Sequence, residues 1–116
     1  MSEIDGLWTA EGATLDGWPT SGILMFVRDQ VFGGGNRYYC LGRYRLQARR
    51  IEIEAHIYHY HGSNQSHLAG GTPDFTVHYR GRVLAGSEII DGTVYRAENP
   101  NLKLPVQLVR RAALSA

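Results

Sequence analysis

The sequence predicts an all-β fold, a small antiparallel up-and-down barrel of about eight strands. The chain of 116 residues contains 14 glycines, and these recur between short runs rich in Val, Ile, Tyr, Phe and Thr. Short runs of this kind between glycine-containing turns are typical of antiparallel barrels and sandwiches. No window shows a sustained apolar period of about 3.6 residues with a helix cap, so helices are not expected. The length fits one domain, residues 1–116.

Turn residues and period-2 alternation of apolar side chains divide the chain into strands. The last strand is the clearest example of this alternation, because it contains Leu102, Leu104, Val106 and Leu108. The same criteria predict eight strands at 5–14, 20–27, 30–34, 37–47, 50–61, 74–84, 88–97 and 103–111.

Charge pairing defines the register of the hairpin formed by 37–47 and 50–61. A turn centred between Ala48 and Arg49 places two arginines opposite two glutamates on one face, namely Arg45 opposite Glu52 and Arg43 opposite Glu54. The other face then pairs apolar or small residues: Leu46 with Ile51, Tyr44 with Ile53, Gly42 with Ala55, and Cys40 with Ile57. A slip of one residue would turn the charges into the core, so this register is strongly favoured.

Ala48 and Arg49 are poor residues for a type I′ turn, so a loop wider than two residues is expected there. The facing glutamates also change the meaning of the basic run in this hairpin. Its arginines are expected to form a solvated face rather than a nucleic-acid surface: Arg37, Arg43, Arg45, Arg49 and Arg50.

Two further hairpins follow from turn residues. A turn at Gly86-Ser87 pairs Val83 with Ile90, Tyr79 with Val94 and Arg82 with Asp91. A turn at Arg28-Asp29 joins two strands whose faces are both apolar, since Ile23, Met25 and Val27 alternate with Leu24 and Phe26, and Val31 with Phe32.

A half-exposed antiparallel sheet normally has one polar face. The two-sided hairpin therefore predicts an outer face covered by another subunit or a loop, with a local bulge as the alternative. The predicted dimer or partner surface comprises Leu24, Phe26, Val31, Arg49 and Arg50. The polar connection Gly62–Pro73 is either a functional lid or plain disorder.

Composition narrows the class of protein. Twelve Lys and Arg against eleven Asp and Glu give a net charge of +1, which argues against a dedicated nucleic-acid or polybasic membrane binder. No apolar run approaches the roughly 18 residues of a membrane helix, and the acidic N-terminus lacks the layout of a secretion signal. The single cysteine, Cys40, fits a reducing compartment. We therefore expect a cytoplasmic protein.

The sequence contains no recognisable enzyme signature, and no cofactor is expected. His59 and His61 are two residues apart and share a strand face, but no third ligand or nearby carboxylate joins them, so a metal site is not expected. The remaining histidines are His56, His67 and His78. Cys40 faces the core without a base or cation partner, which indicates a packed thiol. Gly33-Gly34-Gly35 lacks the helix and Lys of a phosphate loop and is interpreted as a bent strand.

An eight-stranded barrel is just wide enough to hold its own side chains or one small apolar ligand. The interior positions that would contact such a ligand are Tyr44, Ile53, Ile57, Val77 and Tyr79. Several of these side chains are large, but Gly42, Ala55 and Gly81 leave room between them.

Gly6-Leu7-Trp8 resembles the Gly-x-Trp motif of lipocalin-type barrels. In that superfamily the Trp closes the base of the barrel and stacks on an Arg near the last strand, a role that falls to Arg110 or Arg111 here.

The order of several short motifs resembles the GrlR-like family, named for a negative regulator of bacterial type III secretion. These motifs are Asp5-Gly6-Leu7-Trp8, Ser21-Gly22-Ile23-Leu24, Val31-Phe32-Gly33-Gly34, Tyr38-Tyr39-Cys40-Leu41-Gly42-Arg43-Tyr44, Tyr79-Arg80-Gly81-Arg82-Val83 and Ile89-Ile90-Asp91-Gly92. The resemblance implies a lipocalin-like barrel of eight strands, often dimeric and without catalytic activity. The named member binds a transcriptional activator and holds it inactive.

The chain departs from that family at two places. Gly35 or Asn36 stands where the family often has Asp after the paired glycines. Where the named regulator has an acidic stretch used to bind its activator, this chain has Gln47, Ala48, Arg49 and Arg50, so the charge complementarity is reversed. The resemblance thus implies a homodimeric, non-enzymatic regulator that sequesters a protein partner; the alternative is a carrier or sensor of a small apolar ligand.

Overall fold

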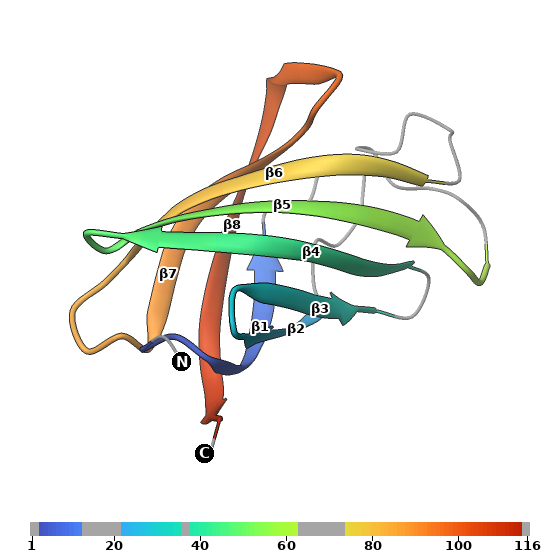
Figure 1. Cartoon of the computed structure of the whole chain (residues 1–116). Coiled ribbons are helices and arrows are strands. Elements are labelled where there is room, and N and C mark those ends of the chain that lie inside the picture. Colours follow the sequence, from blue (N-terminus) through green and yellow to red (C-terminus); the bar gives the residue numbers. More distant parts are fainter. Residues whose placement is uncertain (1–2, 13–21, 36–37, 63–73, 115–116) are drawn as a thin grey trace.

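Eight antiparallel strands form a closed barrel in the computed structural model, which describes residues 3–12, 22–35, 38–62 and 74–114 (Figure 1). Each strand pairs with the next one in the sequence, and β1 pairs with β8 to close the sheet. The predicted all-β up-and-down barrel is confirmed. The strands are β1 (Gly6–Gly12), β2 (Gly22–Val27), β3 (Gln30–Gly34), β4 (Tyr38–Gln47), β5 (Arg50–His59), β6 (Asp74–Val83), β7 (Ile89–Arg96) and β8 (Asn99–Ala113).

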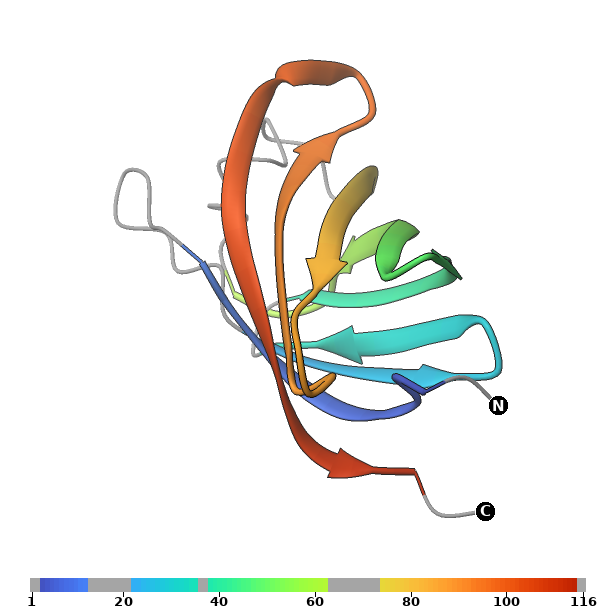
Figure 2. The same ribbon diagram turned by 90° about the vertical axis from the view of Figure 1, so that its left-hand side faces the viewer.

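Two strands differ at their ends from the predicted ranges. β5 ends at His59 instead of residue 61, so His61 lies beyond the strand. β8 is longer than 103–111, because it pairs with two neighbours along different parts of its length: Asn99 opposes Arg96 of β7, and Ala113 opposes Gly6 of β1. Its long curved path is visible in Figure 2. In the described ranges no helix is long and apolar enough to cross a membrane.

The predicted registers of two hairpins are confirmed. In β4–β5, Arg45 opposes Glu52, Arg43 opposes Glu54 and Tyr44 opposes Ile53. In β6–β7, the three predicted pairs are also present: Val83 with Ile90, Tyr79 with Val94, and Arg82 with Asp91. Alternating charged and apolar positions therefore predicted which residues face each other.

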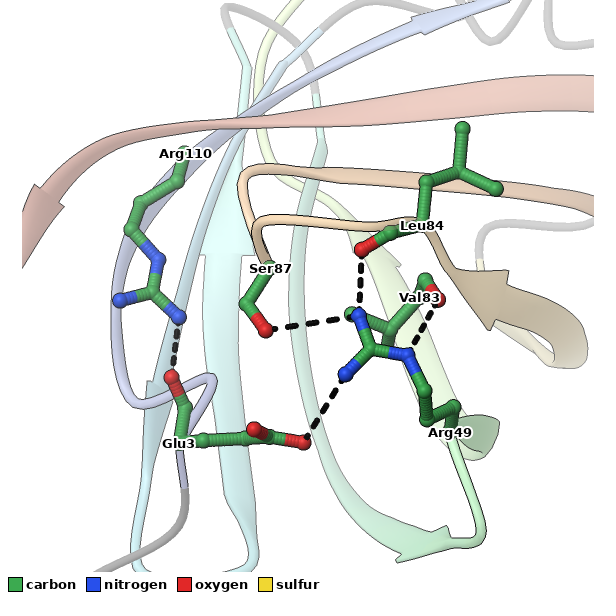
Figure 3. A network of polar contacts seen from close by, with 6 residues as sticks. All are labelled: Glu3, Arg49, Val83, Leu84, Ser87 and Arg110. Atoms are coloured by element: carbon green, nitrogen blue, oxygen red, sulfur yellow. Dashed lines mark hydrogen bonds and ion pairs between the residues drawn. The ribbon is translucent and has the colours of Figure 1, made fainter.

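The turn between β4 and β5 is tighter than predicted. Gln47 pairs directly with Arg50, and Ala48 and Arg49 have positive φ angles of 52° and 66°, as in a two-residue type I′ turn. The wider loop expected from the sequence is therefore wrong. Contacts of the Arg49 side chain with distant residues hold this turn (Figure 3): its Nε donates to the Val83 carbonyl at 3.1 Å, and its Nη2 donates to the Leu84 carbonyl.

The N-terminal segment closes one end of the barrel through the buried carboxylate of Asp5, whose residue is 3% exposed. The Tyr44 hydroxyl donates to Asp5 Oδ1 at 2.5 Å, and the Arg28 amide donates to Asp5 Oδ2 at 3.1 Å. The Leu114 amide donates to the Asp5 carbonyl at 3.2 Å. Asp5 thus connects β4, the β2–β3 turn and the end of β8.

Trp8 is fully buried beside this network, and its Nε1 donates to the Ile4 carbonyl at 2.8 Å. The Arg110 guanidinium lies 5.1 Å from the Trp8 ring, while Arg111 donates instead to Thr9 Oγ1 at 2.9 Å. The predicted Trp–Arg contact is confirmed, with Arg110 as the partner. Trp8 also makes an edge-to-face contact with Phe26, with ring centroids 5.9 Å apart. Phe26 makes a similar contact with Tyr44, with ring centroids 5.2 Å apart.

Replacing Ala48 by Gly should stabilise the barrel by about 1 kcal/mol, because an L-residue at positive φ is strained and glycine is not. Urea unfolding followed by tryptophan fluorescence measures this change. Ala85→Gly is the matched control, since Ala85 is an exposed turn residue without positive φ and glycine there should be neutral or destabilising. An equal gain from both substitutions would contradict the explanation.

Removing the Asp5 carboxylate should destabilise the fold more than removing the hydroxyl that binds it. Tyr44→Phe deletes one donor and should cost about 1–2 kcal/mol, whereas Asp5→Ala removes the acceptor of the buried Tyr44 hydroxyl and of the part-buried Arg28 amide and should cost about 3 kcal/mol or more. Urea denaturation of both single variants and the double variant gives their coupling energy. Additive effects would mean that the two side chains do not act as a pair.

Candidate protein-binding site

Large apolar side chains cover the outside of β2, β3 and β4. We call this set the outer apolar face; its members and their exposed fractions are Ile23 (52%), Met25 (38%), Phe32 (42%), Tyr39 (42%) and Leu41 (46%). Met25 opposes Phe32, and Phe32 opposes Leu41, so three of them form one row across three strands.

The outer apolar face continues toward the end of β5. Tyr60 is 55% exposed, its ring centroid lies 6.0 Å from that of Tyr39, and its hydroxyl donates to the Gly35 carbonyl at 2.6 Å. The five members of the outer apolar face, without Tyr60, expose on the order of 500 Å² of surface. Contiguous apolar patches of a few hundred Å² typically mark interaction sites. Singly exposed apolar residues, in contrast, are common.

Two residues predicted to form this surface belong instead to the core. Phe26 is 0% exposed and Val31 is 1% exposed, and the two oppose each other across β2 and β3 with their side chains toward the interior. Leu24 is partly buried against the same core. Placing Phe26 and Val31 on a partner surface is therefore wrong, since the odd-numbered residues of β2 are the ones that face outward.

Tyr39 and Leu41 are members of the outer apolar face that were not predicted from the sequence. They alternate with Cys40, which is buried, and they share a strand face with Arg43 and Arg45. The prediction for that strand face used only its charged residues and left out the apolar ones. The period-2 pattern alone already placed all four residues on one side of β4.

Arg49 and Arg50 lie at the opposite end of β4 and β5 from Tyr39 and Leu41. Besides its contacts with two carbonyls, the Arg49 guanidinium lies 3.9 Å from Glu3 Oε1 and 3.5 Å from Ser87 Oγ (Figure 3). It therefore joins three segments of its own chain. The predicted partner residues do not form one surface.

Arg50 borders an open hollow of about 750 Å³ between the β4–β5 turn and the end of β6. Arg45, Arg49 and Arg82 also line it, and Glu52 is the one acidic lining residue among those that the structure describes. This hollow is a second surface feature, separate from the outer apolar face.

The residues predicted to contact an apolar ligand do line the barrel interior. Tyr44, Ile53, Val77 and Tyr79 are only 5–7% exposed, and Ile57 is partly buried against them. Side chains around a ligand-sized cavity retain more accessible surface than this, so the interior that they surround is filled by side chains.

The glycines do not leave the space expected from the sequence. A Cβ on Gly81 would lie 2.8 Å from Tyr79 Cε2, and one on Gly92 would lie 2.6 Å from Tyr79 Cζ. The Tyr79 ring thus occupies the room above both glycines, and its hydroxyl donates to the Val106 carbonyl at 2.9 Å.

The described histidines are dispersed. His56 Nδ1 lies 2.7 Å from Thr76 Oγ1, His78 Nε2 lies 3.9 Å from Glu54 Oε2, and His59 Nε2 lies 2.9 Å from the His61 carbonyl. His67 lies outside the described residues. In the described ranges, no three His, Cys, Asp or Glu side chains form a group suited to a metal ion.

Cys40 is buried, and burial raises the pKa of its thiol to about 11 from an ordinary value of 9.0. A thiol with such a pKa is protonated at neutral pH, whereas nucleophilic attack requires the thiolate. Cys40 therefore has the environment of a packed core residue.

The raised pKa of Cys40 predicts a loss of stability at high pH. Above pH 9 the unfolded chain releases the thiol proton while the folded chain keeps it, so the free energy of unfolding should fall as the pH rises from about 9 to 11, by about 2 kcal/mol. Urea unfolding at several pH values measures the slope. Cys40→Ala should flatten the curve; an equally steep curve for this variant would assign the loss to other groups, such as Tyr79, whose pKa burial also raises.

The architecture is that of a small lipocalin-like barrel with eight antiparallel strands. Comparison of the chain with models of protein families gives no match, and comparison with curated proteins gives none either.

Proposed function

We propose that this chain is a non-enzymatic regulator that works by holding a protein partner, and that it assembles as a homodimer through the outer apolar face. The supporting observation is the contiguous row of Met25, Phe32 and Leu41, which lies on the side of an antiparallel sheet where polar residues normally face water. Two such faces packed together would bury about 1,000 Å², near the lower size limit for specific interfaces. The proposed mode of action is that of the negative regulator of type III secretion whose motif order the sequence resembles.

The alternative of an apolar-ligand carrier has less support. The interior residues that would contact a ligand are packed against one another, with Tyr79 occupying the space above two glycines. Native mass spectrometry of gently purified protein separates the two proposals: a dimer without added mass favours the regulator, and roughly a few hundred extra daltons per chain would favour the carrier.

Phe32→Glu should dissociate the dimer without unfolding the barrel. Phe32 is 42% exposed in the single chain, so the carboxylate stays hydrated in the monomer but would be buried in the dimer. The dissociation constant should rise by about 100-fold or more, because burial of an unpaired charge costs several kcal/mol. Size-exclusion chromatography with light scattering gives the mass, and circular dichroism confirms folding.

Asn101→Glu provides the matched control, because it adds the same charge at an exposed position of β8. This variant should remain a dimer. A wild-type protein that has the mass of one chain at about 100 μM, or a Phe32→Glu variant that dimerises like the wild type, would overturn the assignment of this face.

A further inference from the structure

The hollow beside the β4–β5 turn concentrates positive charge on a chain whose net charge is only +1. Four of its lining residues are arginines, and they come from β4, the turn, β5 and β6: Arg45, Arg49, Arg50 and Arg82. Glu52 is the acidic residue among the described lining residues. Open hollows lined by one sign of charge attract ligands of the opposite sign.

Two of these arginines face each other directly. Arg50 of β5 and Arg82 of β6 are register partners, and both are exposed. Like charges at directly opposed positions destabilise a sheet. Among the residues that the structure describes, neither guanidinium forms an ion pair with a carboxylate. Asp91 of β7 opposes Arg82 from the other side and offsets part of the repulsion between the two guanidinium groups; a bound anion would relieve the rest.

Arg49 makes a different contribution. Its guanidinium donates hydrogen bonds to the carbonyls of Val83 and Leu84 and lies 3.9 Å from Glu3 Oε1. These contacts fix the turn against the end of β6. Arg50 and Arg82 are therefore presented on a rigid wall, which lowers the entropy cost of binding.

We propose that this hollow binds an acidic segment of a partner protein, one that carries several carboxylates within a few residues. The inference rests on the proposed protein-binding function and adds the chemistry of the partner. Guanidinium groups bind carboxylates through paired N–H donors, and a hollow of about 750 Å³ is far larger than one small anion.

A peptide fits this hollow better than a nucleic acid does. Nucleic-acid surfaces neutralise many phosphates along an extended basic track. Here Glu52 stands between Arg45 and Arg80, and Asp91 stands beside Arg82, so acidic residues interrupt the basic surface around the hollow. Leu84 and Ala85 add an apolar border that suits the aliphatic portions of a peptide.

The test is a titration of the full chain into fluorescein-labelled hexaglutamate, followed by fluorescence anisotropy. The wild type should show saturable binding that weakens as salt is added. The Arg50→Gln/Arg82→Gln variant should weaken binding by about tenfold or more, since each lost charged contact accounts for a factor of several. Without peptide, this variant should melt within about 2 °C of the wild type, because it removes the Arg50–Arg82 repulsion and also the charge of Arg82 opposite Asp91.

Arg43→Gln/Arg111→Gln is the control, because it removes the same charge from exposed residues outside the hollow. It should change binding by less than about twofold. Amide chemical shifts of the wild type provide a second measurement that needs no variant, and the peptide should move the signals of Arg50, Arg82 and Leu84.

Several results would overturn the inference: no saturable binding, equal weakening by the control, or shifts confined to the outer apolar face. Tighter binding of hexathymidylate than of hexaglutamate would assign the hollow to nucleic acid, and full displacement of the peptide by millimolar phosphate would assign it to small anions. If the peptide does not bind but the wild type is a dimer that Phe32→Glu dissociates, only this inference is overturned. If the wild type binds the peptide but is a monomer, the proposed dimer is overturned instead.

Discussion

The buried carboxylate of Asp5 is the contact on which the closed end of the barrel depends. It accepts hydrogen bonds from Tyr44 and from the amide of Arg28, while its own carbonyl accepts one from Leu114. β4 also bonds directly to the β2–β3 turn, because the Tyr44 amide donates to the Asp29 carbonyl at 2.9 Å, whereas the sheet ladder reaches the end of β8 only through β1. A buried carboxyl group is costly unless its hydrogen bonds are satisfied, and these contacts hold the segment before β1 in one position. That position places Trp8 against Phe26 and beneath Arg110.

Arg49 has a corresponding role at the β4–β5 turn. Its positive φ is unfavourable for a side chain with a Cβ, but its guanidinium gains contacts with Val83, Leu84 and Glu3 (Figure 3). The turn, the end of β6 and the N-terminal segment are thereby held together by one side chain. Arg49 also lines the hollow, together with Arg50 and Arg82.

The outer surface of the barrel is chemically divided along its strands. On β4 the outward positions change from Tyr39 and Leu41 to Arg43 and Arg45; Phe32 of β3 lies opposite Leu41, and Glu54 and Glu52 of β5 lie opposite the two arginines. The outer apolar face and the basic hollow are therefore separate surfaces on one rigid sheet.

The sequence by itself determined the strand pairing, because alternating charges and apolar residues allow only one register for β4–β5 and for β6–β7. It also predicted that Trp8 would contact an arginine near the end of the last strand. It did not determine whether Arg110 or Arg111 would make this contact. Tertiary structure decided which face of β2 and β3 is buried, since both faces are apolar and alternation cannot choose between Phe26 and Met25. It also decided the tight turn at Ala48 and the burial of Asp5, because the groups that stabilise them, at Val83 and Tyr44, lie more than thirty residues away along the chain.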